Sequence, residues 1–340
     1  MITGNHSVLQ VLADEKAPWQ QQLANMITDL PTLLSVLRLT NPPQSLADMV
    51  TNPFPVRVTR HFAGLMEPEN WHDPLLQQVL PWGSEHQDTG GYTTDPLGEE
   101  AATVLPGLIH KYPSRVLIVP TSACAIHCRY CFRRHFPYAE HRLTRQHQDD
   151  IVQYLRDHPD VNEVIFSGGD PLMLTDAHLG RWLSALETVD TLTRVRLHTR
   201  LPIVLPDRVT STLVQRLTQS RLQAVMVLHS NHPNELSPEL AKALQPLRTS
   251  EVLLLNQAVL LRGVNDSVAV QSALAERLFA LGVLPYYVHQ TDKVAGTAHF
   301  AVSDETALHL HQRVKASLPG FLVPKLVREI AGQSSKTWLP

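Results

Sequence analysis

The residues best suited to chemistry are three cysteines, Cys124, Cys128 and Cys131, which lie within eight positions of one another. Thiolates bind iron-sulfur clusters, and a four-iron cluster ordinarily takes four of them. A CxxxCxxC run supplies three, so one iron keeps an open position that can chelate a substrate or cofactor. The spacing therefore predicts a reactive [4Fe-4S] cluster.

A zinc site is the main alternative for these thiols. Structural zinc usually takes four ligands at different spacings, and the chain has no fourth cysteine. His127 or His135 would complete such a site only in a strained local arrangement. The 18 histidines are otherwise scattered, as surface and core histidines are, and we assign them no metal.

The cysteine spacing resembles that of the radical S-adenosylmethionine (SAM) superfamily, in which the cluster reduces SAM to give a 5'-deoxyadenosyl radical. A second motif, Ser167-Gly168-Gly169-Asp170, follows a predicted strand. Two glycines let the backbone approach a ligand closely, which suits binding of the SAM amino group. An ordinary strand-to-helix turn with Asp170 near a cap is the alternative, and the cysteines after the preceding strand favour SAM.

A narrower resemblance rests on several motifs in a fixed order between about Tyr112 and Lys336. Besides the Gly-Gly turn, they are Cys128-Arg-Tyr-Cys131-Phe-Arg133-Arg134, His229-Ser-Asn-His-Pro-Asn-Glu235, Asn256-Gln257 and Arg262-Gly-Val-Asn-Asp266. Together they resemble the lysine 2,3-aminomutase family, which also uses pyridoxal 5'-phosphate (PLP). The resemblance places His229 and Gln257, with the Ser167–Asp170 turn, at the SAM site.

The resemblance also implies a lysine that binds PLP covalently. The matching residue is Lys336, in Ala331-Gly332-Gln333-Ser334-Ser335-Lys336, although the family has a more glycine-rich turn here. By its position alone, Lys336 would be a solvated lysine near the chain end. Lys111, Tyr112 and Arg115 match residues that help to hold PLP, with Lys111 and Arg115 as phosphate partners.

Substrate recognition is implied by three further matches. Arg133 matches the family's carboxylate clamp, a natural role for a bidentate guanidinium. Asp292 and Glu329 match the two acids that receive the lysine ε-ammonium, although the family has aspartate in place of Glu329. Without the resemblance, each acid would be read as a solvated carboxylate or an ion-pair partner. Charges at both ends of the pocket predict a diamino acid as substrate.

Alternating β-rich and amphipathic runs after position 115 predict repeated βα units. The fold class we predict is α/β, a partial (β/α)6 radical SAM barrel with an N-terminal helical appendage, and its active site lies where the strands end. The predicted strands cover 116–120, 163–167, 194–198, 223–229, 252–260 and 283–290. The predicted helices cover 145–158, 176–189, 207–219, 238–247, 268–281 and 304–318.

The first part of the chain has helical runs at 8–12, 19–30 and 33–39, then a proline-rich section. We divide the chain into an N-terminal helical appendage (1–110), the radical SAM partial barrel (111–320) and a C-terminal segment with the PLP lysine (321–340). The net charge of -3 gives no reason to expect nucleic acid binding, and no apolar stretch is long enough to span a membrane. With no signal peptide evident and three free thiols, we expect a cytoplasmic enzyme.

The resemblance implies an isomerase that converts (S)-α-lysine to (R)-β-lysine by a 1,2-amino migration dependent on the cluster, SAM and PLP. A reductase or flavodoxin would donate the electron. The short chain is most similar to the bacterial form whose β-lysine modifies elongation factor P through a separate ligase. The alternatives are a radical SAM enzyme that acts without PLP on another substrate and a non-enzymatic iron-sulfur scaffold.

Overall fold

A computed structural model describes residues 18–43, 54–138 and 143–339 of the chain. Its centre is one sheet whose strands follow each other in sequence order from β1 to β10. The strands are β1 Thr103–Leu105, β2 Leu108–Tyr112, β3 Arg115–Ile118, β4 Glu163–Phe166, β5 Arg194–Thr199, β6 Gln223–His229, β7 Leu253–Val259, β8 Leu284–His289, β9 Lys325–Arg328 and β10 Thr337–Trp338.

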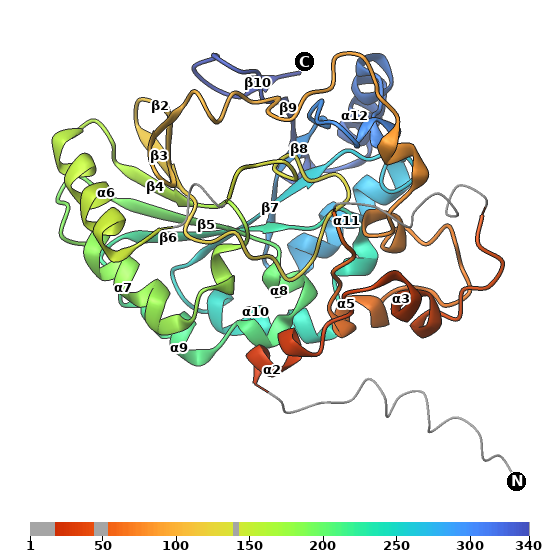
Figure 1. Ribbon diagram of the computed structural model, residues 1–340, viewed down its shortest axis with the longest axis horizontal. Coiled ribbons are helices and arrows are strands. Elements are labelled where there is room, and N and C mark those ends of the chain that lie inside the picture. The colour runs from red at the N-terminus through yellow and green to blue at the C-terminus, as the bar shows by residue number, and fades with distance from the viewer. Residues whose placement is uncertain (1–17, 44–53, 139–142, 340) are drawn as a thin grey trace, which may run out of the picture.

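Helices cover the outside of the curved sheet (Figure 1). The α-helices are α2 Trp19–Ala24, α3 Leu30–Val36, α5 Arg60–Gly64, α6 Arg145–Asp157, α7 Asp176–Leu186, α8 Leu201–Val204, α9 Ser211–Thr218, α10 Pro238–Arg248, α11 Val268–Ala280 and α12 Asp304–Ser317. Short 3-10 helices are η1 Leu76–Gln78, η2 Gly83–His86, η3 Pro171–Met173, η4 Pro206–Arg208, η5 Pro233–Glu235, η6 Ala298–Phe300 and η7 Gly320–Leu322.

Strands β3 to β9 pair in parallel, while β1 and β2 add an antiparallel hairpin at one edge and β10 pairs antiparallel with β9 at the other. The two edge strands of the described sheet, β1 and β10, are not neighbours, so the barrel is partial. This confirms the predicted fold class, with β9 as a seventh parallel strand after the sixth helix. No helix in the described ranges is long and apolar enough to cross a bilayer.

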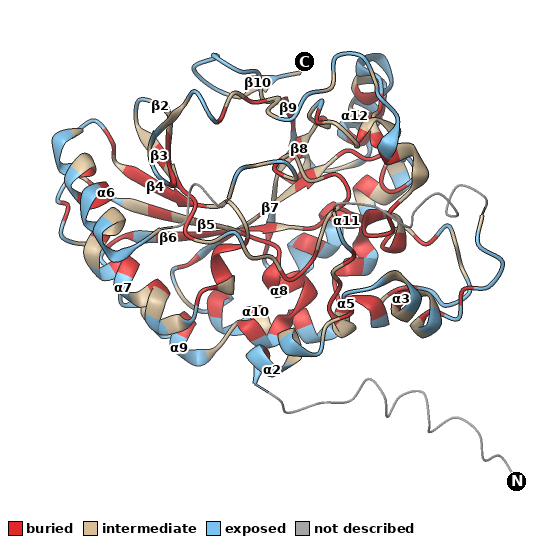
Figure 2. Ribbon diagram, viewed as in Figure 1, coloured by how far each residue is buried: buried red, intermediate tan, exposed pale blue. Residues whose placement is uncertain are grey.

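Side-chain patterning explains why the helices lie outside the sheet. Helix α7, for example, buries Leu179, Trp182, Leu183 and Leu186, spaced three and four residues apart, and begins at the N-cap Thr175. Strand β4 is buried at every position, as expected for a parallel strand covered on both faces. Figure 2 shows the same division, with buried helix surfaces facing the sheet and exposed surfaces facing outward.

Some predicted boundaries differ from the structure. The helix predicted over 207–219 is split, because Thr210 caps a new helix, α9, after the turn of η4. The run predicted over 19–30 ends as α2 at Ala24, and Ile27 instead pairs with Val58. The predicted run at 8–12 lies outside the described residues. Strand β2 crosses the predicted boundary at residue 110, so the three-part division of the chain stays a prediction.

Candidate active site

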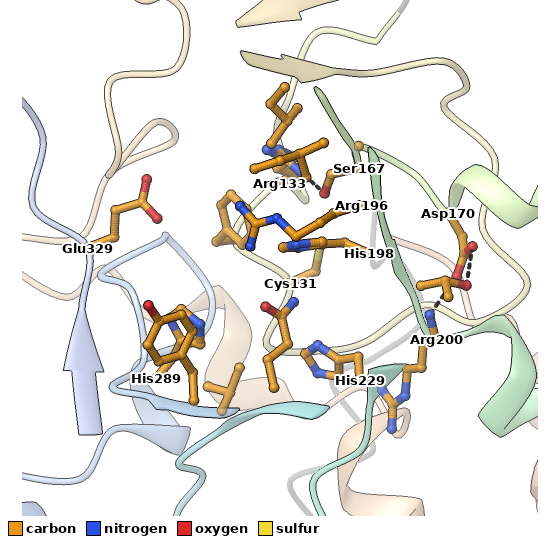
Figure 3. A pocket seen from close by; sticks show the side chains of 18 of the residues that line it. Cys131, Arg133, Ser167, Asp170, Arg196, His198, Arg200, His229, His289 and Glu329 are labelled. Carbon is orange, nitrogen blue, oxygen red and sulfur yellow. Dashed lines mark hydrogen bonds between the residues drawn. The ribbon is translucent and has the colours of Figure 1, made fainter. Parts of the chain in front are cut away.

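A cavity of about 780 Å³ occupies the inside of the barrel, from the turns after the strands down to Leu253 at the start of β7. Its volume is in the usual range for ligand pockets. All of the predicted site residues line it: Lys111, Tyr112, Arg115, Cys124, Cys128, Cys131, Arg133, Ser167, Gly168, Gly169, Asp170, His229, Gln257, Asp292, Glu329 and Lys336. Figure 3 shows several of their side chains converging from different strands.

The cysteine loop follows β3, and its backbone is held by hydrogen bonds with the N-terminal segment. The amide of Arg129 donates to the carbonyl of Gln78 at 2.8 Å, and Arg57 donates to the carbonyl of Cys124 at 3.2 Å. All three cysteines are free thiols. Burial, followed by the neighbouring cysteines, raises the pKa of Cys131 to about 11 and that of Cys124 well above its ordinary value. Iron binding would therefore release protons from these thiols.

A zinc ion and a cluster need different arrangements of the three thiols. A zinc ion needs its ligands grouped around one centre, and among the described residues no three His, Cys, Asp or Glu side chains are grouped in this way. A four-iron cluster instead takes each thiolate on a different iron, which spreads the sulfurs apart.

The Gly-Gly turn after β4 packs directly against the cysteine loop. The amide of Gly169 donates to the carbonyl of Thr121 at 3.0 Å, and that of Asp170 to Ala123 at 2.8 Å. Gly168 has a φ of +107°, and a Cβ on Gly169 would lie 2.5 Å from the carbonyl oxygen of Ala123. The glycines are thus needed for contact between two loops, in addition to any contact with a ligand.

Asp170 is buried, and its carboxylate accepts hydrogen bonds from the backbone of its own turn and of the segment after β5. It accepts hydrogen bonds from the Thr199 hydroxyl and from the amides of Leu172, Arg200 and Leu201 at 2.7–3.0 Å. In this structure its oxygens therefore fix the connection after β5, and a direct role in SAM binding stays a prediction.

His229, at the end of β6, lies near the cysteine loop, and Gln257 lies beside it in the sheet on β7. The His229 ring stacks on Tyr130, with its Nε2 atom 3.0 Å from the tyrosine hydroxyl. Burial, followed by the charge of Arg200, lowers the pKa of His229 well below its ordinary value, so the imidazole is neutral.

Arg133 is oriented by two side chains. Glu99, which the sequence analysis missed, accepts from its Nε and Nη2 atoms at 2.6 Å each, and Ser167 accepts from Nη1 at 3.0 Å. A guanidinium has five N–H donors, so these contacts use three and leave two for a ligand carboxylate. The only sequence signal for Glu99 was its place in an acidic stretch, since its partner lies 34 residues away.

A chain of alternating charges continues from Glu99 to the predicted PLP lysine. Lys111 lies 3.8 Å from Glu99 and 3.2 Å from Glu329, and Glu329 also accepts a short hydrogen bond from Lys336. Lys336 is therefore not a solvated lysine but lies in the cavity, paired with an acid. Lys111, predicted as a phosphate partner, is paired here with carboxylates, and its role toward phosphate stays a prediction.

The two predicted ε-ammonium acids have different charge states. Burial, followed by the nearby charge of Glu329, raises the pKa of Asp292 to about 7. Burial has the same tendency at Glu329, but Lys336 and Lys111 outweigh it and lower the pKa of Glu329 to about 2. Near neutral pH, Glu329 therefore carries a full negative charge, while Asp292 is only partly ionised.

A cationic region on β3 and β5 lines the same cavity as Lys336. Arg115 stacks over the ring of Tyr112 at 4.1 Å, and Arg196 lies beside Glu163 at 2.7 Å. The Nε of Arg196 and the Nε2 of His198 are buried without a hydrogen-bond partner in the described ranges. Figure 3 shows these two side chains next to each other, extending from β5 into the cavity.

Arg196 and His198 are not among the site residues predicted from the sequence. Their signal was available, because polar residues alternate along β5 at 194, 196 and 198, where a buried parallel strand would otherwise be apolar.

Comparisons with known proteins agree with this site. The sequence model of the radical SAM superfamily matches residues 118–210, which include the cysteine loop and the Gly-Gly turn. The L-lysine 2,3-aminomutase of Escherichia coli is 46% identical over 94% of this chain and 93% of its own length. That of Haemophilus influenzae is 43% identical over 95% and 96%. The chain belongs to the lysine 2,3-aminomutase family.

As a member of the lysine 2,3-aminomutase family, the chain is an isomerase whose cofactors are a [4Fe-4S] cluster, SAM and PLP. The family also contains longer proteins. The L-lysine 2,3-aminomutase of Clostridium subterminale is 32% identical over 94% of this chain but only 77% of its own length. This chain thus matches the shorter relatives from end to end and the longer ones only in part.

Proposed function

We propose that this protein is an L-lysine 2,3-aminomutase that converts (S)-α-lysine to (R)-β-lysine. The observation that carries the proposal is a cavity lined by Arg133, by the two acids Asp292 and Glu329, and by Lys336 beside Glu329. A cation and two acids match the two charged ends of lysine. A substrate with an acidic side chain would meet carboxylates instead of a cation.

The residues present fit PLP as well as lysine. The amine of Lys336 lies inside the cavity, where it could bond to the PLP aldehyde carbon. The unpartnered N–H of Arg196, with Arg115 and His198, would hold an anionic phosphate, because a buried donor without a partner costs free energy that a ligand oxygen would recover. His198 and Lys336 lie close enough for the lysine's charge to lower the pKa of the histidine, after burial and Arg196.

The residues present also fit the cluster and SAM. Cys124, Cys128 and Cys131 would bind three irons, and the turn at Ser167–Asp170 packs on the same loop. When bound, the cluster and SAM would supply a carbon radical that removes hydrogen from C3 of lysine, and PLP would supply a carbon that binds the amino nitrogen and can carry the unpaired electron while nitrogen moves from C2 to C3.

The protein's own part is to bind, orient and exclude water. Arg133 would bind the α-carboxylate through the two donors that Glu99 and Ser167 leave available. Glu329, which accepts from Lys336 here, would accept from the substrate ε-ammonium instead, and the amine of Lys336 would hold PLP until the substrate amine takes its place. Asp292 would hold a proton on its carboxyl oxygen below about pH 7 and act as the second anion above it.

The test is anaerobic incubation of the iron-reconstituted protein with L-lysine, SAM, PLP and dithionite, followed by chiral chromatography. We expect (R)-β-lysine from the wild type and none from Lys336→Ala, while both variants cleave SAM. SAM cleavage without β-lysine in the wild type would indicate a radical SAM enzyme with another substrate. Failure to bind SAM at all would leave an iron-sulfur scaffold.

Further proposals concern the cellular role. The match to the shorter relatives supports free β-lysine as a precursor for modification of elongation factor P by a separate ligase, with a reductase or flavodoxin as electron donor. We place this work in the cytoplasm, because free thiols and an oxygen-sensitive cluster need a reducing compartment. Incubation with lysyl-elongation factor P in place of lysine tests whether lysine is isomerised before it is attached. Faster reaction of lysyl-elongation factor P than of free lysine would contradict this order.

A further inference from the structure

A buried arginine, Arg200, lines the cavity and contacts the cysteine loop directly. Arg200 follows β5 directly and is 5% exposed. Its Nη1 atom donates to the sulfur of Cys128 at 2.8 Å and also to the Tyr130 hydroxyl. Figure 3 shows its side chain extending past His229.

The position of this guanidinium is fixed by several contacts. Its Nη2 atom donates to Gln78 at 2.7 Å and to the carboxylate of Glu235 at 3.1 Å, while its backbone amide donates to Asp170 at 2.7 Å. Gln78 belongs to the N-terminal segment, and Glu235 follows β6. Three separate parts of the chain therefore aim one permanent positive charge at one cysteine sulfur.

The surroundings distinguish Arg200 from the other arginines near the loop. Arg129 and Arg134 both pair with Glu85, and within the described residues neither donates a hydrogen bond to a cysteine sulfur, as Arg200 does. Arg200 shares Glu235, but that carboxylate also accepts from Gln78 and from the amides of Asn231 and His232. Those three bonds end on Oε1 of Glu235, while Nη2 of Arg200 donates to Oε2, so Glu235 holds Nη2 and leaves Nη1 directed at the sulfur.

We propose that Arg200 is a positioning residue that raises the reduction potential of the cluster by donating to the sulfur of Cys128. The inference rests on the proposed role of the three cysteines as cluster ligands. Hydrogen bonds to cluster sulfurs and nearby charge are established determinants of cluster potential. One-electron reduction adds a negative charge to the cluster, and a fixed cation at one ligand stabilises that reduced form more than the oxidised form.

The electron balance involves an external donor. A reductant such as dithionite gives one electron to the cluster, and the cluster passes it to the sulfonium of SAM, whose carbon-sulfur bond breaks. Arg200 takes no electron and no proton in this sequence. It changes how readily the first transfer occurs.

The experiment is an anaerobic redox titration of the reconstituted protein, followed by electron paramagnetic resonance of the reduced cluster. Wild type is compared with Arg200→Gln, Arg200→Lys and a control, Arg216→Gln. Arg216 also pairs with a carboxylate, Glu187 at 2.9 Å, but it lies on α9 and does not line the cavity. Iron and sulfide content shows that each variant holds a cluster.

We expect Arg200→Gln to lower the equilibrium constant for reduction roughly tenfold, which is about 59 mV for a one-electron couple. Arg200→Lys should lower it by less, because its single ammonium keeps the charge but cannot reach Cys128, Gln78 and Glu235 together. Arg216→Gln should keep the wild-type midpoint potential. That result would exclude the explanation that removing any one arginine charge from the protein lowers the potential.

An unchanged midpoint in Arg200→Gln would overturn the inference. If that variant fails to hold a cluster, Arg200→Lys decides, and a wild-type midpoint there would overturn it too. Failure of the wild type to assemble a cluster would instead contradict the proposed function, so the two ideas fail in different ways.

Discussion

At the residue scale, Asp292 and Glu329 predict how lysine binding depends on pH. The pKa of Asp292 is about 7, because burial and then Glu329 raise it, so the carboxyl is neutral in acid and ionised in base. The ε-ammonium of lysine should therefore bind better as the pH rises through 7. We expect KM for lysine to fall roughly tenfold between pH 6 and 8 in steady-state assays.

The matched variant is Glu329→Gln. It removes the charge that raises the pKa of Asp292, so the pH at which KM changes should move to lower values while KM itself increases. A KM profile with the same midpoint in both proteins would show that a different group titrates.

Glu99 supports a second prediction at this scale. Its bidentate contact fixes the direction of Arg133, so Glu99→Gln should loosen the carboxylate clamp and weaken lysine binding roughly tenfold, or about 1.4 kcal/mol. Isothermal titration with L-lysine and with 1,5-diaminopentane compares the affinities of two ligands that share both amino groups but differ in the carboxylate. The diamine has no carboxylate, so its affinity should not change, and an equal loss for both ligands would mean a general disruption of the site.

At the scale of elements, the contact between two loops depends on Gly169. A methyl group there would meet backbone atoms of Ser122 and Ala123 at 2.5–2.7 Å, and backbone cannot rotate away as a side chain can. Gly169→Ala should therefore lower the free energy of unfolding by roughly 1–3 kcal/mol and reduce cluster content, as measured by urea unfolding and iron analysis.

Gly180 provides the control for this glycine prediction. It lies within α7, and the nearest atom to an added Cβ, on Arg216, is 3.9 Å away. Gly180→Ala should stabilise the protein by up to about 1 kcal/mol, because alanine is the better helix former. If both substitutions lower the free energy of unfolding equally, lack of space around Gly169 does not explain the loss of stability in Gly169→Ala.

The sequence predicted the helices and strands more completely than it predicted the residues of the site. Alternation of β-rich and amphipathic runs was sufficient for β3 to β8 and for the helices between them, apart from the split at η4, because the helices bury one face and the strands are largely buried. Strand β9 corresponds to a β-like run in the C-terminal segment that was not assigned to the barrel, because only its pairing with β8 shows that the run joins the sheet. In the site, motif residues were found, but Glu99 and Arg200 were not, since their roles depend on partners 34 and 72 residues away.

At the scale of the whole molecule, a buried ion cluster joins the N-terminal segment to the barrel. Glu85, in η2, accepts from both Arg129 and Arg134 of the cysteine loop, and all three side chains are at most 5% exposed. Removing one partner of a buried pair leaves an uncompensated charge. Glu85→Gln should therefore destabilise the protein by roughly 3–5 kcal/mol in urea unfolding, whereas a loss within experimental error would mean that the segment is held by apolar packing alone.

Cofactor binding should stabilise the whole fold through Lys336. This residue immediately precedes β10, which closes one edge of the sheet by pairing with β9. A ligand that binds the native state at 100 times its dissociation constant adds about 2.7 kcal/mol to the free energy of unfolding. We expect PLP to raise the melting temperature of the wild type and to slow hydrogen exchange at residues 325–339. In Lys336→Ala, the covalent tether is lost, so both effects should shrink at the same PLP concentration. Equal stabilisation of the two proteins would mean that PLP is held by its phosphate contacts and that Lys336 serves only as the partner of Glu329.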